Sequence, residues 1–149
     1  MKKFVLDTGI LLHYIRESKL AKDIERELKL MARDSIPIIS AVSVGEIEGF
    51  CQRQRWSESK IAAMKRILSK VLIINISGHD NLLMETYATL WNYSKNALPE
   101  NKTGQSIGIG QNDVWIAATA KVADAALVTT NGDFDHLNGN WIRVFKYSL

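Results

Sequence analysis

Cysteine is almost absent from this sequence of 149 residues. Its single cysteine, Cys51, excludes an internal disulfide, and no Cys/His spacing suits a zinc site. Long apolar runs are also missing, since the stretch 71–74 falls far short of the roughly 18 residues that a membrane helix requires. Asp7 and Arg16 interrupt the apolar residues near the N-terminus, so we expect no signal peptide there. These absences predict a protein of the reducing cytoplasm without a membrane span.

The sequence also lacks internal repeats, low-complexity segments and any linker that would divide it. With 46% hydrophobic residues it can bury a proper core, and we expect a single domain over residues 1–149. The net charge is only +3, from 19 basic and 16 acidic residues. Bound cations that neutralise four clustered acids would leave +7 on the rest of the chain, and such a surface attracts polyanions.

Hydrophobic patterning predicts an alternation of strands and helices. Strands are expected at residues 3–6, 36–40, 71–74, 126–130 and 141–145, and helices at 10–16, 42–55, 80–96 and 112–123. Two more helices are expected, one beginning at Ser57 and one whose apolar face comprises Leu20, Ile24, Leu28 and Met31. The glycine-rich segment 99–110 is expected to be a loop. This alternation predicts an α/β fold with a mostly parallel sheet and helices on both faces.

Four acidic residues stand at the edges of these predicted elements: Asp7, Glu46, Asp113 and Asp133. Ligands of open parallel sheets bind beyond the carboxyl ends of the strands, so folding would gather these acids in one crevice. Taken singly, each acid is better explained as a helix-start or surface charge, and the hypothesis depends on their conjunction. Clustered carboxylates stay ionised only beside positive charge, which predicts bound Mg²⁺ or Mn²⁺.

The same residues fall into four segments that resemble the motifs of the PIN domain nucleases, and among them the VapC-type toxins. The segments are 5–12, 39–49, 112–120 and 127–135, in order and with compatible spacing over nearly the whole chain. The resemblance implies a three-layer α/β/α sandwich whose metal-binding acids correspond to Asp7, Glu46, Asp113 and Asp133. It also implies a homodimer and an antitoxin protein as partner.

One position departs from the family pattern. Many relatives carry an acid where this chain has Asn131, so Asp133, or Asp135 as the less favoured choice, must supply the charge. The small hydroxyl residue that the family keeps near the last motif corresponds to Thr129.

Both the residues and the resemblance predict metal-assisted hydrolysis of a phosphodiester. The resemblance further implies an endoribonuclease that cleaves RNA as the toxin of a toxin–antitoxin pair. Water is the expected nucleophile, positioned through hydrogen bonds from Thr8, Thr129 and Asn131. The alternative is an inactive PIN-like module that binds RNA or protein, which Asn131 makes credible. An aspartyl-phosphatase route is disfavoured because Gly9 occupies the position where those enzymes need a second acid.

Two basic zones carry weaker predictions. Arg53, Arg55 and Lys60 follow the Glu46 helix, and we interpret them as candidate nucleic-acid contacts, although plain surface charge explains them at least as well. A second stripe recurs at helical spacing through Arg16, Lys19, Lys22, Arg26, Lys29 and Arg33. For this stripe a solvated helix face is the preferred interpretation.

Overall fold

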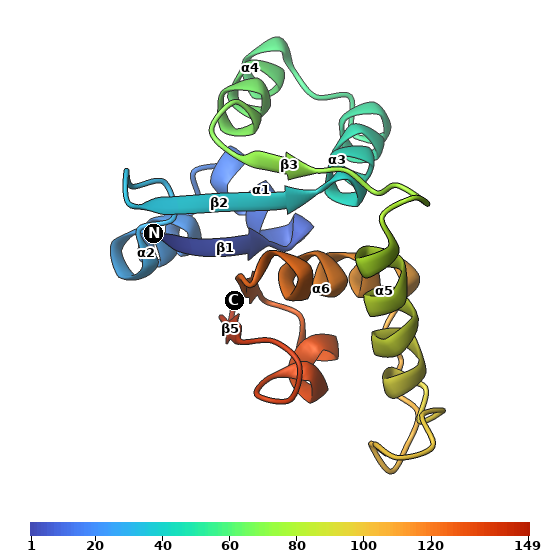
Figure 1. Ribbon diagram of the computed structural model, residues 1–149. Helices are drawn as coiled ribbons and strands as arrows, with labels where there is room; N and C mark the ends of the chain where they lie inside the picture. The colour runs from blue at the N-terminus through green and yellow to red at the C-terminus, as the bar shows by residue number, and fades with distance from the viewer.

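A five-stranded β-sheet forms the middle layer of the protein in a computed structural model that describes residues 1–149. Figure 1 shows its arrangement among the helices. Its strands are β1 (Lys2–Leu6), β2 (Ser35–Ser40), β3 (Leu72–Ile74), β4 (Ala126–Thr129) and β5 (Val144–Lys146). They lie in the order β3-β2-β1-β4-β5, and every neighbouring pair is parallel. The predicted parallel sheet is confirmed, and it contains no antiparallel strand.

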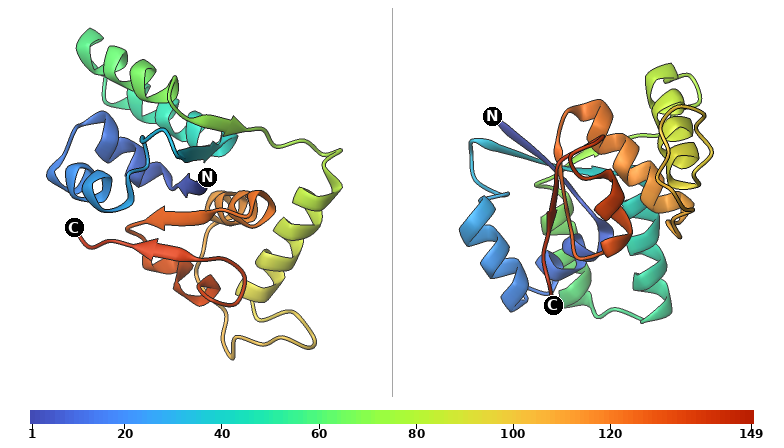
Figure 2. Two further views of the ribbon diagram at one scale, coloured as in Figure 1. Left: turned by 60° about the vertical axis from the view of Figure 1, so that its left-hand side comes forward. Right: turned by 90° about the horizontal axis from the view of Figure 1, so that it is seen from below.

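Helices cover both faces of this sheet (Figure 2). They are α1 (Thr8–Ile15), α2 (Lys19–Leu28), α3 (Ala41–Arg53), α4 (Glu58–Leu68), α5 (Asn81–Ser94), α6 (Gln111–Ala123) and the 3₁₀ helix η1 (Gly132–Leu137). Successive strand residues point to opposite faces. Phe4 and Leu6 of β1 therefore pack with α1 to α4, while Val5 packs with α5, α6 and η1. The predicted three-layer α/β/α architecture is confirmed.

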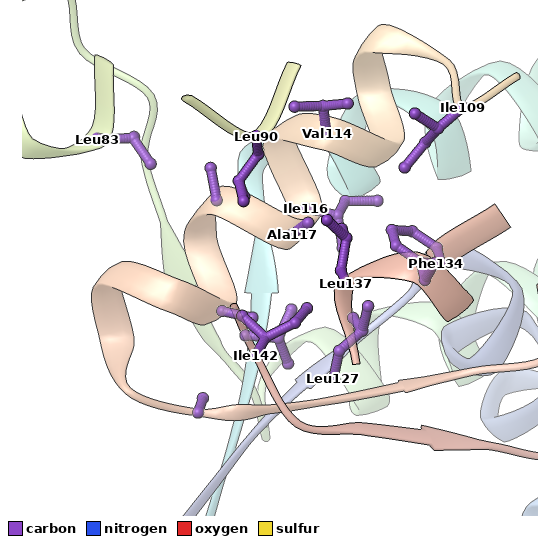
Figure 3. Packing of buried hydrophobic residues seen from close by; sticks show 14 of the residues in the cluster. Leu83, Leu90, Ile109, Val114, Ile116, Ala117, Leu127, Phe134, Leu137 and Ile142 are labelled. Atoms are coloured by element: carbon purple, nitrogen blue, oxygen red, sulfur yellow. The ribbon is translucent and has the colours of Figure 1, made fainter. Parts of the chain in front are cut away.

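Each face of the sheet has its own hydrophobic core. Figure 3 shows the core beneath α5 and α6, where Leu90, Ile116 and Leu127 are fully buried. On the other face Ile10 and Ile24 are equally buried. Burying one such side chain contributes roughly 1.5–3 kcal/mol to folding, so the two cores hold the helices firmly against the sheet.

The chain changes direction across the sheet between β1 and β4. It runs outward from β1 through β2 to β3, and then α5 and α6 carry it back to β4 on the other side of β1. Such a reversal leaves a crevice beyond the carboxyl ends of the two strands. The amide of Asp7 donates to the carbonyl of Val128 at 3.0 Å, which joins these two strand ends. Residues after β1 and after β4 are thus neighbours in space.

Helix α2 is shorter than its apolar pattern predicts, and Met31 lies outside it. The helix ends at Leu28 because Lys29 adopts a left-handed conformation with φ 54°. The Glu25 carboxylate then accepts a bond from the amide of Met31 at 3.0 Å, so this side chain binds the segment that leaves the helix. The predicted basic stripe is correspondingly shorter, with only Lys19, Lys22 and Arg26 on α2.

The last strand is also displaced from its predicted position at residues 141–145. Trp141 and Ile142 lie in a tight turn in which both amides donate to the carbonyl of Leu137. Gly139 allows this turn because its φ is +84°, a conformation that side chains with a Cβ rarely adopt. Strand β5 begins only at Val144.

None of the helices combines the length and the apolar character that are needed to cross a membrane.

Candidate active site

Asp7 follows β1 directly and is nearly buried, with 8% of its surface exposed. It is the N-cap of α1, where its Oδ1 accepts from the amide of Thr8 at 2.8 Å. Its Oδ2 accepts from the hydroxyl of Thr129 at 2.7 Å, across 122 positions of sequence. Burial raises the pKa of Asp7, the bonds from Thr129 and Thr8 oppose this, and the charge of Glu46 raises it further.

Glu46 lies on α3, about a turn and a half from the helix start, and is half-buried. Its Oε1 accepts from the hydroxyl of Thr8 at 2.7 Å. The hydroxyl of Ser43, one turn earlier on α3, lies 2.8 Å from the same Thr8 oxygen. Thr8 thus contacts two acids, Asp7 through its amide and Glu46 through its side chain.

Asp113 lies in the first turn of α6, and its carboxylate interacts electrostatically with the other three acids. Burial and the charges of Asp7, Glu46 and Asp133 raise its pKa from 3.8 to about 6. A helix N-terminus favours negative charge, but here desolvation and three like charges outweigh that preference. The side-chain Nδ2 of Asn131 donates to Oδ2 of Asp113 at 3.4 Å, a long hydrogen bond.

The segment after β4 carries Asn131 and Asp133 to the same edge of the sheet. The Asn131 side-chain oxygen caps η1 by accepting from the amide of Asp133 at 2.9 Å. Asp133 itself is exposed, and its charge reaches Asp113. Asp135, the less favoured candidate, forms an ion pair with Lys146 at 2.8 Å. This ion pair favours Asp133 as the fourth acid of the cluster.

An open recess of about 340 Å³ lies between α3 and the start of α6. It is lined by Glu46, Gly110, Gln111, Asn112 and Asp113, with no hydrophobic residue among them. A larger recess of about 560 Å³ lies at the other edge of the sheet, against Lys2, Lys3 and Arg143. We place the candidate site at the smaller recess because two of the four acids, Glu46 and Asp113, line it.

The four acids offer a divalent cation suitable donors, although no three acidic, histidine or cysteine side chains already form a closed cage. Carboxylate oxygens are the hard ligands that Mg²⁺ and Mn²⁺ prefer, and neither sulfur nor imidazole borders the recess. Burial and then the charges of Asp7, Glu46 and Asp133 raise the pKa of Asp113, and no salt bridge of the protein involves any of these four acids. The donor chemistry therefore fits a divalent cation, and side-chain movement would have to bring the oxygens together.

Two residues of this region were not anticipated from the sequence, Ser43 and Lys146. Ser43 stands three positions before Glu46 and is fully buried, a combination that marks it as a partner only once α1 and α3 are in contact. Lys146 pairs with Thr129 in the β4–β5 register, which places it at the same edge of the sheet as Asp7.

The predicted nucleic-acid contacts lie on the α3–α4 side of the molecule. The guanidinium carbon of Arg53 lies 4.7 Å from the ring centroid of Phe50. The ammonium of Lys60 lies 4.3 Å from the ring centroid of Trp56. Arg55, between the two helices, is exposed. On α2, Lys19 and Arg26 both pair with Asp23, as expected of a solvated helix face.

Comparison with known proteins identifies the class to which this fold and site correspond. The PIN domain family matches residues 4–140, and the chain belongs to this family. A comparison with curated protein sequences found no match.

Several solved structures share the fold over nearly their whole length. A chain of VapBC2 from Rickettsia felis, bound to a DNA fragment from their promoter, has a TM-score of 0.75 and 22% identity, with 98% of this chain and 99% of that chain covered. A toxin–antitoxin complex from Klebsiella pneumoniae has a TM-score of 0.67 and 22% identity, covering 97% and 98%. VapC20 from Mycobacterium tuberculosis, described as a sarcin-ricin loop cleaving toxin, has a TM-score of 0.62 and 14% identity, covering 95% and 98%.

Proposed function

We propose that this PIN domain protein is a metal-dependent endoribonuclease that hydrolyses RNA phosphodiesters. The observation that carries the proposal is a hydrogen-bond network that links acids from separate segments. Thr8 binds both Asp7 and Glu46, and Thr129 donates to Asp7. Asn131 donates to Thr129 through its backbone amide and to Asp113 through its side chain. Burial and then the charges of Asp7, Glu46 and Asp133 raise the pKa of Asp113, which is consistent with acids gathered at the crevice between β1 and β4. A fold gains nothing in stability from uncompensated like charges, whereas a site for a divalent cation requires them.

In the proposed reaction, water attacks phosphorus, the bond to the ribose oxygen breaks, and that oxygen leaves with a proton. A divalent cation held by Asp7, Glu46, Asp113 and Asp133 would supply positive charge to the phosphate and promote deprotonation of the water. Thr8 and Thr129 each donate to one acid and accept one bond, from Ser43 and from the amide of Asn131. The Thr8 oxygen retains one lone pair that can accept a proton of the attacking water, whereas Thr129 is fully buried and acts by orienting Asp7.

Replacement of single acids tests this proposal. Asp7→Asn and Asp113→Asn should fold normally and lose RNA cleavage by at least about a hundredfold, because each removes a charged ligand. The measurement is cleavage of an RNA oligonucleotide with Mn²⁺ or Mg²⁺. Asp124→Asn is the matched control, since Asp124 is exposed at the end of α6 in a left-handed conformation that asparagine also adopts. It should cleave like the unaltered protein.

Undiminished turnover by either site variant would contradict the assignment. The competing function is a PIN-like module that binds RNA or protein without cutting it. It is favoured by the neutral side chain of Asn131, which stands where many relatives carry an acid. A chelator separates the two functions. A nuclease stops cutting in EDTA, whereas a binding module never cuts and keeps its RNA affinity.

The biological role that we propose is that of a toxin held inactive by an antitoxin protein. It is supported by the descriptions of proteins that share the fold, among them a toxin–antitoxin complex and a cleaving toxin. A homodimer is part of the same proposal. The product of a short neighbouring reading frame, where one exists, should form a complex with this protein on gel filtration and inhibit its cleavage of RNA. Full activity in that complex would contradict the role.

A further inference from the structure

Ser43 is a fully buried residue of α3, and its hydroxyl contacts a different helix. The Ser43 oxygen lies 2.8 Å from the hydroxyl oxygen of Thr8 at the start of α1. The Thr8 hydroxyl in turn lies 2.7 Å from Oε1 of Glu46. Three side chains thus form a continuous chain that ends on one of the four acids.

The directions of these hydrogen bonds follow from the chemistry of the groups. An ionised carboxylate can only accept, so Thr8 must donate its single hydroxyl proton to Glu46. With that proton committed, the short contact to Ser43 is a bond only when Ser43 is the donor. The chain therefore runs from Ser43 to Thr8 to Glu46, and each donor strengthens the next bond.

A buried helical hydroxyl has a simpler partner available, which makes this arrangement informative. Thr119 of α6 is equally buried, and it donates to the carbonyl of Trp115 four residues earlier in its own helix at 2.8 Å. Ser43 bonds across to α1 instead. Its hydroxyl therefore sets the orientation of the Thr8 side chain, which donates to Glu46, while the backbone amide of the same residue donates to Asp7.

We infer that Ser43 is a positioning residue for the acid cluster and acts on Glu46 through Thr8. Its contribution to metal binding rests on the proposed function. Because Ser43 and Glu46 lie one turn apart on the same face of α3, the chain links that face to Thr8. With Ser43 replaced by alanine, the Thr8 hydroxyl is no longer constrained and Glu46 loses its defined position.

The experiment uses Ser43→Ala, with Thr119→Val as the matched control that removes an equally buried hydroxyl elsewhere. Mn²⁺ affinity, measured by electron paramagnetic resonance, should fall about tenfold in Ser43→Ala and stay unchanged in Thr119→Val. In metal-free protein, the NMR signal of the Thr8 hydroxyl proton should exchange faster with water in Ser43→Ala alone. On a Thr8→Val background the additional change Ser43→Ala should cost no further affinity, because the intermediate link is already missing.

The outcomes separate this inference from the proposed function. Equal Mn²⁺ affinity and equal hydroxyl exchange in Ser43→Ala and the unaltered protein overturn the inference and leave the nuclease intact. A full effect of Ser43→Ala on the Thr8→Val background overturns it too, because Ser43 then acts by packing alone. Failure of the unaltered protein to bind Mn²⁺ overturns the proposed function, while the hydroxyl signal still decides whether Ser43 orients Thr8.

Discussion

At the scale of single residues, the hydrogen bonds to the site acids come from neutral groups, and none of these acids has a basic side chain as a partner. Asp7 accepts from Thr8 and Thr129, and Asp113 accepts only a long bond from Asn131. The salt bridges of the protein involve Asp23 and Asp135, so none of the four site acids has a basic partner. Neutral donors offset only part of the repulsion, and the pKa of Asp113 stays raised.

Burial of the Asp113 charge, together with repulsion from the other three acids, predicts that Asp113→Asn stabilises the metal-free protein at neutral pH. Between its usual 3.8 and the raised value of about 6, Asp113 binds a proton more tightly in the folded than in the unfolded state, so its contribution to stability falls as pH rises through this window. Asparagine does not ionise, so the Asp113→Asn variant does not lose this stability as the pH rises. We expect a gain of about 1 kcal/mol, or roughly 2–4 °C in Tm, at pH 7.5.

Thermal unfolding in EDTA at pH 7.5 and pH 4 measures this effect. The gain should disappear at pH 4, because Asp113 is then mostly protonated in the folded protein. The exposed Asp124→Asn control should show no gain at either pH. A lower Tm for Asp113→Asn at pH 7.5 would contradict the electrostatic account of the site.

At the scale of elements, the connection between α5 and α6 determines where Asp113 stands. This segment, residues 95–110, contains no helix or strand, and Lys95 holds its end in place. The Lys95 ammonium donates to the carbonyls of Ile107 at 2.8 Å and Ile109 at 3.1 Å, and it lies over the ring of Trp91. Gly110, the N-cap of α6, follows at once and has no side-chain cap of its own. Lys95 therefore helps to place the start of α6.

Lys95→Met should loosen this connection without unfolding the sheet. Loss of two charge-assisted bonds weakens local closure, and we expect about tenfold faster proteolysis within residues 96–110. Limited proteolysis followed by mass spectrometry locates the cuts. Lys102→Met is the matched control, because Lys102 is exposed and reaches only the carbonyl of Asn96 at 3.3 Å. Equal cutting rates in the two variants would show that Lys95 does not hold the segment.

At the scale of the whole molecule, an acidic site must attract a polyanion. The net charge of +3 is positive in spite of the four acids, so under the proposed function basic residues elsewhere would attract the RNA. Arg53 lies two turns beyond Glu46 on α3, and Arg55 follows the helix end. The basic residues of α2 include Lys19, which is paired with Asp23, and Lys22. The α3–α4 side is therefore the better candidate for phosphate contact.

Replacing Arg53 and Arg55 together by glutamine should reduce the salt dependence of RNA binding. Each lost phosphate contact lowers the slope of log affinity against log salt by about 0.7 for single strands, so a change of about 1.4 is expected. Binding is best measured on an Asp7→Asn background, which prevents cleavage. Lys19→Gln with Lys22→Gln is the control pair and should leave the slope unchanged. The reverse result would move the RNA path to α2.

Local sequence patterns predict much of the fold. Alternating apolar segments predicted the parallel sheet and the helices on both faces, because strand and helix periodicities depend on neighbouring residues. Acids at element edges predicted which end of the sheet to examine, and Asp7 and Asp113 lie there. The family motifs also run through these local segments, and the PIN domain match covers them.

Contacts between distant segments settled the rest. The Glu25 carboxylate of α2 accepts from the hydroxyl of Tyr14 on α1 and from the amide of Met31, beyond the end of its own helix. Lys146 pairs with Asp135, and Ser43 reaches Thr8 across 35 positions, although no local pattern marks either pair. Charge and hydrogen bonding act through space, and only the folded chain brings these groups within range of one another. The amino-acid order thus specified the elements and the acids, whereas tertiary packing decided how those acids are oriented and charged.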